Sequence, residues 1–271
     1  PARLAPLVSM TWVAWMLAQD SLAAQPVKVL GLLFLLDLIL TWQTVEDDGA
    51  RPWHMGASIA GFALLMTWTT TALTEALLPI ALGFYLLFGA LHALLPIVLQ
   101  RLRPSGDAYN WMHLYPALML LIMIAPILNH TAAWPLMMPV IFLLNLVGLV
   151  ASWLSSAMWI GIVMLTVTTG CFGAWIFTMK EVTELPGFLG VQGFFAVAFH
   201  IWSHISFPKQ GEKSLYTGTP AWLKRVRELA FGPQPEGETE AGSSLDIALL
   251  PSLSAFLPFI LLTMVVLVIR S

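Results

Sequence analysis

Three histidines lie inside apolar stretches of this sequence, at spacings that suit a bound metal ion or haem. His92 lies nine residues before Arg101 and His200 nine residues before Lys209, while His204 follows His200 by four residues. Histidines four apart share a helix face and can hold a metal together, and a pair from separate helices could ligate a haem. Metal sites generally use three or four ligands, and no carboxylate accompanies these histidines in a recognisable pattern. Neutral, hydrogen-bonded histidines are therefore the favoured interpretation.

Asp37 is the acidic residue that lies deepest in an apolar stretch. It precedes a polar turn by about seven residues, which places it about 10 Å inside the apolar layer at 1.5 Å per helical residue. An ionisable residue at that depth is a candidate functional site. The position that matches Asp37 in an internal repeat is Asn145, however. A position that accepts Asp or Asn suits a hydrogen bond between helices better than a proton carrier.

The composition excludes a soluble enzyme and a nucleic-acid-binding protein. Of 271 residues, 58% are hydrophobic and 10% are charged, whereas a soluble domain carries about 25% charged residues. The net charge of -3 provides no basic stripe for phosphates. No Ser/His/Asp set, glycine-rich phosphate loop or pair of carboxylates stands at a usable spacing. The class of protein that remains is a helical membrane protein, because a helix that spans a membrane satisfies its own backbone hydrogen bonds.

Nine apolar runs are long enough to cross the roughly 30 Å of a bilayer's hydrocarbon core. They are residues 4–19, 26–43, 53–73, 76–99, 112–129, 133–154, 157–178, 187–206 and 247–269. Short connections make neighbouring helices antiparallel. The predicted fold is therefore an all-α membrane protein with about nine transmembrane helices in up-down order.

Basic residues predict the orientation of these helices. Nine of the twelve Lys and Arg residues fall at the N-terminus and in the even-numbered loops, and three fall on the other side. Because Lys and Arg accumulate in cytoplasmic loops, the N-terminus and the 207–245 loop are predicted to be cytoplasmic, with the chain in the inner membrane.

Tryptophans at span ends, and one loop segment, are predicted to contact the headgroup layer. Indole rings favour the membrane interface. Residues 220–231 read as a short helix with an apolar face and basic neighbours, which is typical of a helix resting on anionic headgroups. The predicted membrane-interface residues are Trp42, Trp53, Trp153, Trp159, Trp222, Lys224, Arg225 and Arg227.

The sequence contains an internal repeat at an offset of about 108 residues. The segment FLLDL at 34–38 matches FLLNL at 142–146, and His92 matches His200. The predicted unit is four helices, and an even number of spans makes the units parallel repeats. The predicted divisions are repeat one at 1–104, repeat two at 105–208, the cytoplasmic loop at 209–245, and a last helix at 246–271 that opens a third repeat.

These segments resemble a known family. The FLL(D/N)L helix, the Trp-led helix RPWHMGASIAGFALLMTW and the helix LGFYLLFGALHALLPIVLQR are similar to those of the large bacterial predicted-membrane-protein family termed domain of unknown function 2339. The resemblance covers most of residues 1–207, and the cytoplasmic loop fits it least well. The resemblance implies a very large envelope protein with many membrane spans, for which no reaction is assigned.

The sequence therefore predicts a non-enzymatic inner-membrane protein with a transport or scaffolding role and no cofactor. Its expected partners are the lipid bilayer and the rest of a longer parent chain, because the first apolar run begins within a few residues of the start and no initiator Met precedes it. No nucleic acid is expected. The alternative is a membrane redox or metal protein that uses His92, His200 and His204.

Overall fold

The computed structural model describes residues 5–46, 51–102, 110–129, 134–155, 158–179, 184–206, 256–257 and 259–267, which are helical apart from short turns and contain no strand. The helices are α1 (Ala5–Leu17), α2 (Asp20–Ala23), α3 (Pro26–Glu46), α4 (Arg51–Thr71), α5 (Leu78–Leu102), α6 (Tyr115–Leu128), α7 (Trp134–Ser155), α8 (Met158–Thr178) and α9 (Leu185–Ser206). Two short 3-10 helices, η3 (Glu75–Leu77) and η4 (Asn110–Leu114), lead into α5 and α6.

Prolines mark the beginnings of most of these helices. Seven helices carry a proline at their first or second position: Pro6, Pro26, Pro52, Pro79, Pro116, Pro135 and Pro186. Proline is favoured there because its fixed φ suits a helix and the first N–H groups have no helical partner anyway. Long apolar runs follow several of these prolines, and in α3, α5, α7 and α9 they reach the length of a membrane crossing.

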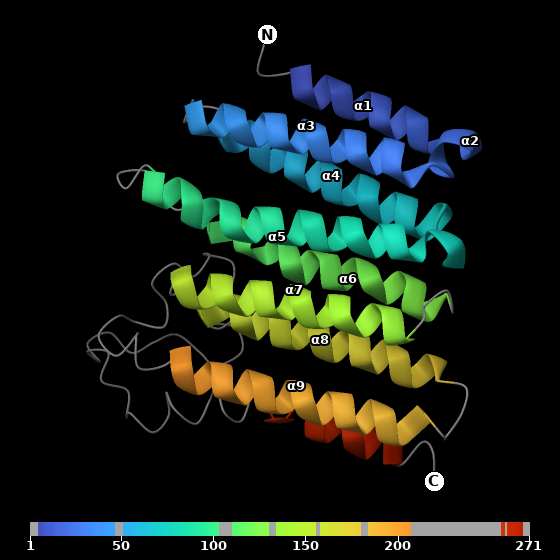
Figure 1. The fold of residues 1–271 in the computed structure, drawn as a ribbon, viewed down its shortest axis with the longest axis vertical. Helices are drawn as coiled ribbons and strands as arrows, with labels where there is room; N and C mark the ends of the chain where they lie inside the picture. Colours follow the sequence, from blue (N-terminus) through green and yellow to red (C-terminus); the bar gives the residue numbers. More distant parts are fainter. Residues whose placement is uncertain are drawn as a thin grey trace, which may run out of the picture.

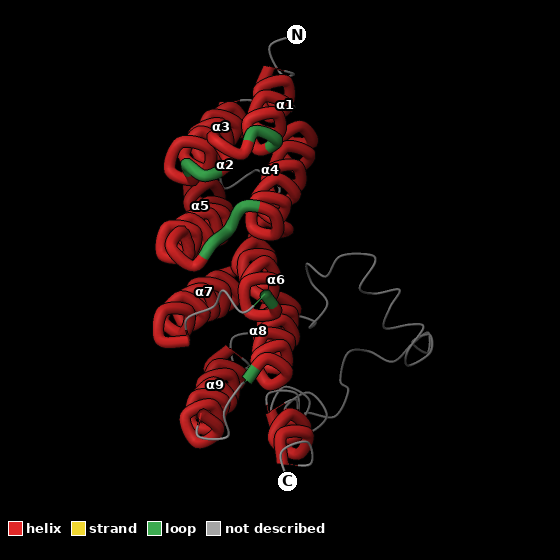
Figure 2. The backbone as a smooth tube through the Cα atoms, turned by 90° about the vertical axis from the view of Figure 1, so that its right-hand side faces the viewer, coloured by secondary structure: helices red, strands yellow, loops and turns green. Residues whose placement is uncertain are grey.

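The helices form a stack two layers thick. Figure 2 shows α3, α5, α7 and α9 in one layer and α1, α4, α6 and α8 in the other. Within each layer, neighbours pack directly, as α5 does on α7 and α6 on α8. Figure 1 shows that all helices of one layer run in the same direction, because the chain alternates between the layers. Each helical hairpin thus adds one helix to each layer.

The length and surface of these helices are compatible with a membrane protein. Five described segments are long and apolar enough to cross a membrane: Pro26–Gln43, Glu75–Val98, Trp134–Ser155, Trp159–Thr178 and Leu185–Ile205. Shorter apolar helices lie at Val8–Leu17 and Met112–Leu128. Large apolar side chains such as Trp12, Ile39 and Phe177 are exposed on the outside of the stack, which lipid tails would cover. The count of nine spans stays a prediction.

Side-chain hydrogen bonds tie the first hairpins together. The Trp68 indole N–H donates to the Ala23 carbonyl at 2.9 Å, which joins α4 to α2. The hydroxyls of Thr69 and Tyr85 lie 2.5 Å apart and join α4 to α5. These contacts hold α4 against α2 and α5.

The offset of 108 residues relates α3 to α7 and α5 to α9, which lie in the same layer (Figure 2). The packing unit visible in the structure is the two-helix hairpin, and the four-helix repeats at 1–104 and 105–208 stay a prediction. The 209–245 loop and its helix at 220–231 lie outside the described residues. Of the segment 246–271, residues 256–257 and 259–267 are helical.

Candidate functional site

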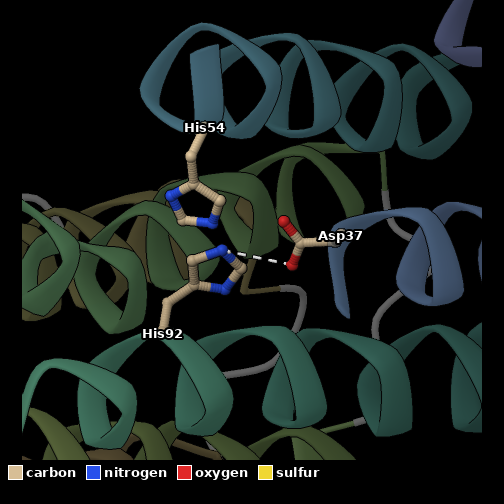
Figure 3. Close-up of side chains that lie close together, drawn as sticks. All are labelled: Asp37, His54 and His92. Carbon is tan, nitrogen blue, oxygen red and sulfur yellow. Dashed lines mark ion pairs between the residues drawn. The ribbon is translucent and has the colours of Figure 1, made fainter. Parts of the chain in front are cut away.

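Asp37, His54 and His92 meet in the interior of the stack. They come from α3, α4 and α5, and each side chain points toward the other two (Figure 3). All three are buried, with exposed fractions of 3%, 1% and 0%. One potential ligand atom of each lies within 4.8 Å of those of the other two. In the part of the chain that the structure describes, no other three His, Cys, Asp or Glu side chains converge in this way.

The His92 ring is held in one orientation. Its Nδ1 lies 3.0 Å from the Phe88 carbonyl, one turn earlier on α5. One face stacks on the Tyr115 ring, with 3.6 Å between centroids and 8° between planes, and the His54 ring is nearly parallel at 6.1 Å. The ring therefore has little freedom to rotate away from Asp37.

The hydrogen bond of His92 at Nδ1 leaves Nε2 facing Asp37. A carbonyl oxygen only accepts hydrogen bonds, so Nδ1 must carry the proton that is shared with Phe88. Nε2 can either carry a proton of its own or act as a ligand through its lone pair. It lies 3.2 Å from Oδ2 of Asp37, and neither atom has a hydrogen-bond partner. Two lone pairs that face each other repel, so a positive species, either a proton or a metal ion, must lie between them.

Further polar groups surround the pair. The Thr41 hydroxyl, one turn after Asp37 on α3, lies 3.1 Å from Nε2 of His54. A cavity of about 10 Å³ adjoins the pair, and Asp37, Ser58, His92 and Tyr115 supply its polar groups. That volume approaches the lower limit of about 10–15 Å³ for one water molecule. The cavity is therefore at the lower limit of the space that one water molecule needs.

The helix that carries His92 contains a proline one turn later. Pro96 lies inside α5 and has no N–H, so the helical hydrogen bond to the His92 carbonyl is missing. Nearby, Nδ1 of His113 in η4 lies 2.9 Å from the Ala93 carbonyl, and because a carbonyl only accepts, the imidazole donates. Pro96 thus leaves the His92 carbonyl without its helical donor, while His113 binds the neighbouring Ala93 carbonyl.

Asn145 makes neutral hydrogen bonds in the second half of the stack. Its side-chain amide donates to the Ile141 carbonyl at 2.9 Å, and its carbonyl oxygen accepts from the Thr168 hydroxyl at 2.8 Å. The second bond joins α7 to α8. Asn145 therefore connects two helices without any ionisable partner.

His200 and His204 lie together near the end of α9 and apart from the Asp37 site. Their ring centroids are 4.5 Å apart, and the His200 ring lies 4.7 Å from Phe256. His204 is exposed. In its layer, α9 is separated from α5 by α7 (Figure 2), so the structure does not bring His200 and His92 together.

Of the predicted interface residues, Trp42 and Trp53 are exposed near the facing ends of α3 and α4. Trp153 is half-buried and Trp159 is buried. The predicted interface residues of the loop, Trp222, Lys224, Arg225 and Arg227, lie outside the described residues. The interface role of the whole set stays a prediction.

The sequence reasoning named Asp37 and His92 separately and assigned no role to His54 or Tyr115. One signal was present: five of the six histidines fall near the predicted cytoplasmic ends of their helices, where residues of adjacent hairpins can meet. Comparison of the chain with protein-family models, with curated proteins and with solved structures finds no match.

Proposed function

We propose that this chain is a polytopic inner-membrane protein that binds a cation between its helices as part of a transport function, without enzymatic activity. The observation that carries the proposal is the buried Asp37–His92 pair, whose facing atoms require a positive species between them. Ionisable residues inside membrane helices are rare, and they commonly line the pathways of ions and protons.

A purely structural role explains this pair poorly. Burying an ion costs several kcal/mol even after the protein has relaxed around it. Joining two helices does not require that cost, because Asn145 and Thr168 join α7 to α8 with a neutral hydrogen bond. The carboxylate and imidazoles between α3, α4 and α5 are therefore better explained by binding than by packing.

The backbone beside the pair also favours transport. Pro96 removes one helical hydrogen bond at the His92 carbonyl. Transporter binding sites are commonly formed where a helix loses backbone hydrogen bonds and its carbonyls can bind an ion, and the His92 carbonyl is a candidate for that role.

Flux measurements in proteoliposomes test the proposal. Purified protein is reconstituted, and entry of protons, K⁺ and divalent transition-metal ions is followed with indicator dyes inside the vesicles. We expect flux of one of these cations, lost in Asp37→Asn and kept in Asp20→Asn, whose side chain is exposed on α2. Folded, reconstituted protein without any flux would leave scaffolding as the role.

The proposed orientation places both the N-terminus and the 207–245 loop in the cytoplasm. It is supported by the distribution of Lys and Arg, nine on that side against three on the other. A reporter fused within residues 233–245 should give a cytoplasmic signal, and a periplasmic signal would reverse the orientation.

A further inference from the structure

We propose that Asp37, His54 and His92 form a binding site for a divalent transition-metal ion such as Zn²⁺. The inference rests on the cation site of the proposed function and names the chemical class of its ligand. Two imidazole nitrogens and one carboxylate oxygen form a donor set that transition metals bind well. Alkali metal ions and Ca²⁺ are less suited, because Ca²⁺ takes six to eight oxygen ligands.

The spacing of the donor atoms fits such an ion. Zinc lies about 2.0–2.2 Å from nitrogen and oxygen ligands, so two ligand atoms at a tetrahedral angle are about 3.3 Å apart. Nε2 of His92 and Oδ2 of Asp37 are 3.2 Å apart. The ligand atom of His54 lies within 4.8 Å of both, and a ring nitrogen of His54 is aimed at them (Figure 3). A small rotation of the His54 side chain would complete a three-ligand site.

The surroundings of His92 are those of a metal ligand. Metal-bound histidines usually donate their other ring N–H to a backbone carbonyl or a carboxylate, which sets the tautomer and the ring orientation. The Phe88 carbonyl, 3.0 Å from Nδ1, performs this role here. The Tyr115 ring, stacked at 3.6 Å, holds the imidazole plane in place. Nε2 is thus directed at the site before any ion arrives.

Thr41 keeps a hydrogen-bond partner when His54 turns from its present hydrogen bond to a metal ion. Nε2 of His54 now lies 3.1 Å from the Thr41 hydroxyl. A threonine in a helix can donate its hydroxyl hydrogen to the carbonyl four residues earlier, and for Thr41 that carbonyl belongs to Asp37. Thr41 therefore keeps a partner when His54 binds the ion.

The site offers a fourth coordination position. The cavity of about 10 Å³ beside Asp37 and His92 approaches the volume of one water molecule. Ser58 and Tyr115 line the same cavity and can hydrogen-bond that water. Zinc sites with three protein ligands keep the fourth position for water or another small ligand.

A shared proton is the competing explanation, and it accounts for less of the geometry. A proton between Oδ2 and Nε2 would satisfy Asp37 and His92. It would give no reason for a third ligand atom on His54 or for the adjoining cavity. Metal binding uses all of these features together.

Metal binding by the purified full chain tests the inference. The protein is purified in mild detergent without chelators, its metal content is measured, and the metal-free form is titrated with Co²⁺ as a visible probe and then with Zn²⁺ as a competitor. We expect one ion per chain, a visible absorption band of low-coordinate Co²⁺, and loss of the band when Zn²⁺ is added. Removing a ligand should weaken binding by more than about 100-fold, since even outer-shell partners contribute 10- to 100-fold.

Matched variants make the result specific. Asp37→Asn and His54→Gln should lose the band, whereas His204→Gln and Asp20→Asn, both at exposed positions, should keep it. Absence of the band in folded wild-type protein, or equal binding by wild-type and Asp37→Asn protein, would overturn the inference. Binding without flux would leave the metal site intact and refute the transport role. Proton flux that depends on Asp37, without metal binding, would refute the metal site and support the transport role.

Discussion

The contact between α8 and α9 depends on a glycine that faces a tryptophan ring. A Cβ atom at Gly161 would overlap the ring carbons Cη2, Cζ2 and Cζ3 of Trp202. The same indole donates its N–H to the Leu149 carbonyl on α7 at 3.2 Å. Gly161→Ala therefore forces the ring to move, and this movement also stretches or breaks the hydrogen bond.

The magnitude follows from three contributions. Extra carbon in a well-packed contact costs about 1–3 kcal/mol, and loss of the indole hydrogen bond costs a further 0.5–1.5 kcal/mol, roughly. Alanine is a better helix former than glycine by about 1 kcal/mol, which offsets part of the loss. We expect Gly161→Ala to lower the free energy of unfolding by about 2 kcal/mol, or about 30-fold in the unfolding equilibrium.

Unfolding by SDS in mixed detergent micelles, followed by circular dichroism, measures this change. Gly83→Ala is the matched control, because nothing lies within 4 Å of its Cβ position, and it should be neutral or slightly stabilising. In a double-mutant cycle, the cost of Gly161→Ala should disappear when Trp202 is already leucine. The reasoning fails if Gly161→Ala unfolds like Gly83→Ala, or if its cost persists without the indole.

Three further outcomes are expected. Trp68→Phe loses the hydrogen bond to Ala23 and should destabilise the protein by about 1 kcal/mol in the same assay. Asn145→Leu removes the bond from Thr168 and should cost about 0.6–1.7 kcal/mol, the range found for polar contacts between membrane helices. Cys171 is buried and should resist maleimide labelling until SDS unfolds the protein, because buried thiols are inert; rapid labelling of folded protein would contradict its placement.

Local signals in the sequence were sufficient to predict the helices. The run 157–178 corresponds closely to α8, Met158–Thr178, and the run 26–43 to α3, Pro26–Glu46. The length of an apolar run and a proline at its beginning both act within one segment, so they can be read without knowledge of the neighbours. The two-layer arrangement was not predicted, because it depends on contacts between segments, such as Gly161 with Trp202.

The site could be predicted only in part for a related reason. Asp37 and His92 were recognisable as polar residues in apolar helices, but they lie on different helices and 55 residues apart. Whether they meet depends on how each helix is rotated about its axis. In a soluble helix the polar face reveals that rotation, whereas helices that are apolar all round give no such signal. His54, near the beginning of α4, therefore could not be assigned to the same site.

Asp37, His92, Asn145 and His200 lie on four successive helices of one layer, at spacings of 55, 53 and 55 residues. Each of these four helices thus carries a polar residue, but the contacts that these residues make differ along the stack. Asn145 bonds to Thr168, and His200 contacts His204 and Phe256. At Asp37 and His92 the opposite layer adds His54 from α4 and Tyr115 from α6. A buried carboxylate needs a positive partner, and the added residues supply a third potential ligand for a cation, on His54, and a ring that holds His92 in place, on Tyr115. The proposed cation site therefore lies among helices α3 to α6. The later hairpins extend the stack, and at the position that matches Asp37 they carry Asn145, which makes neutral hydrogen bonds.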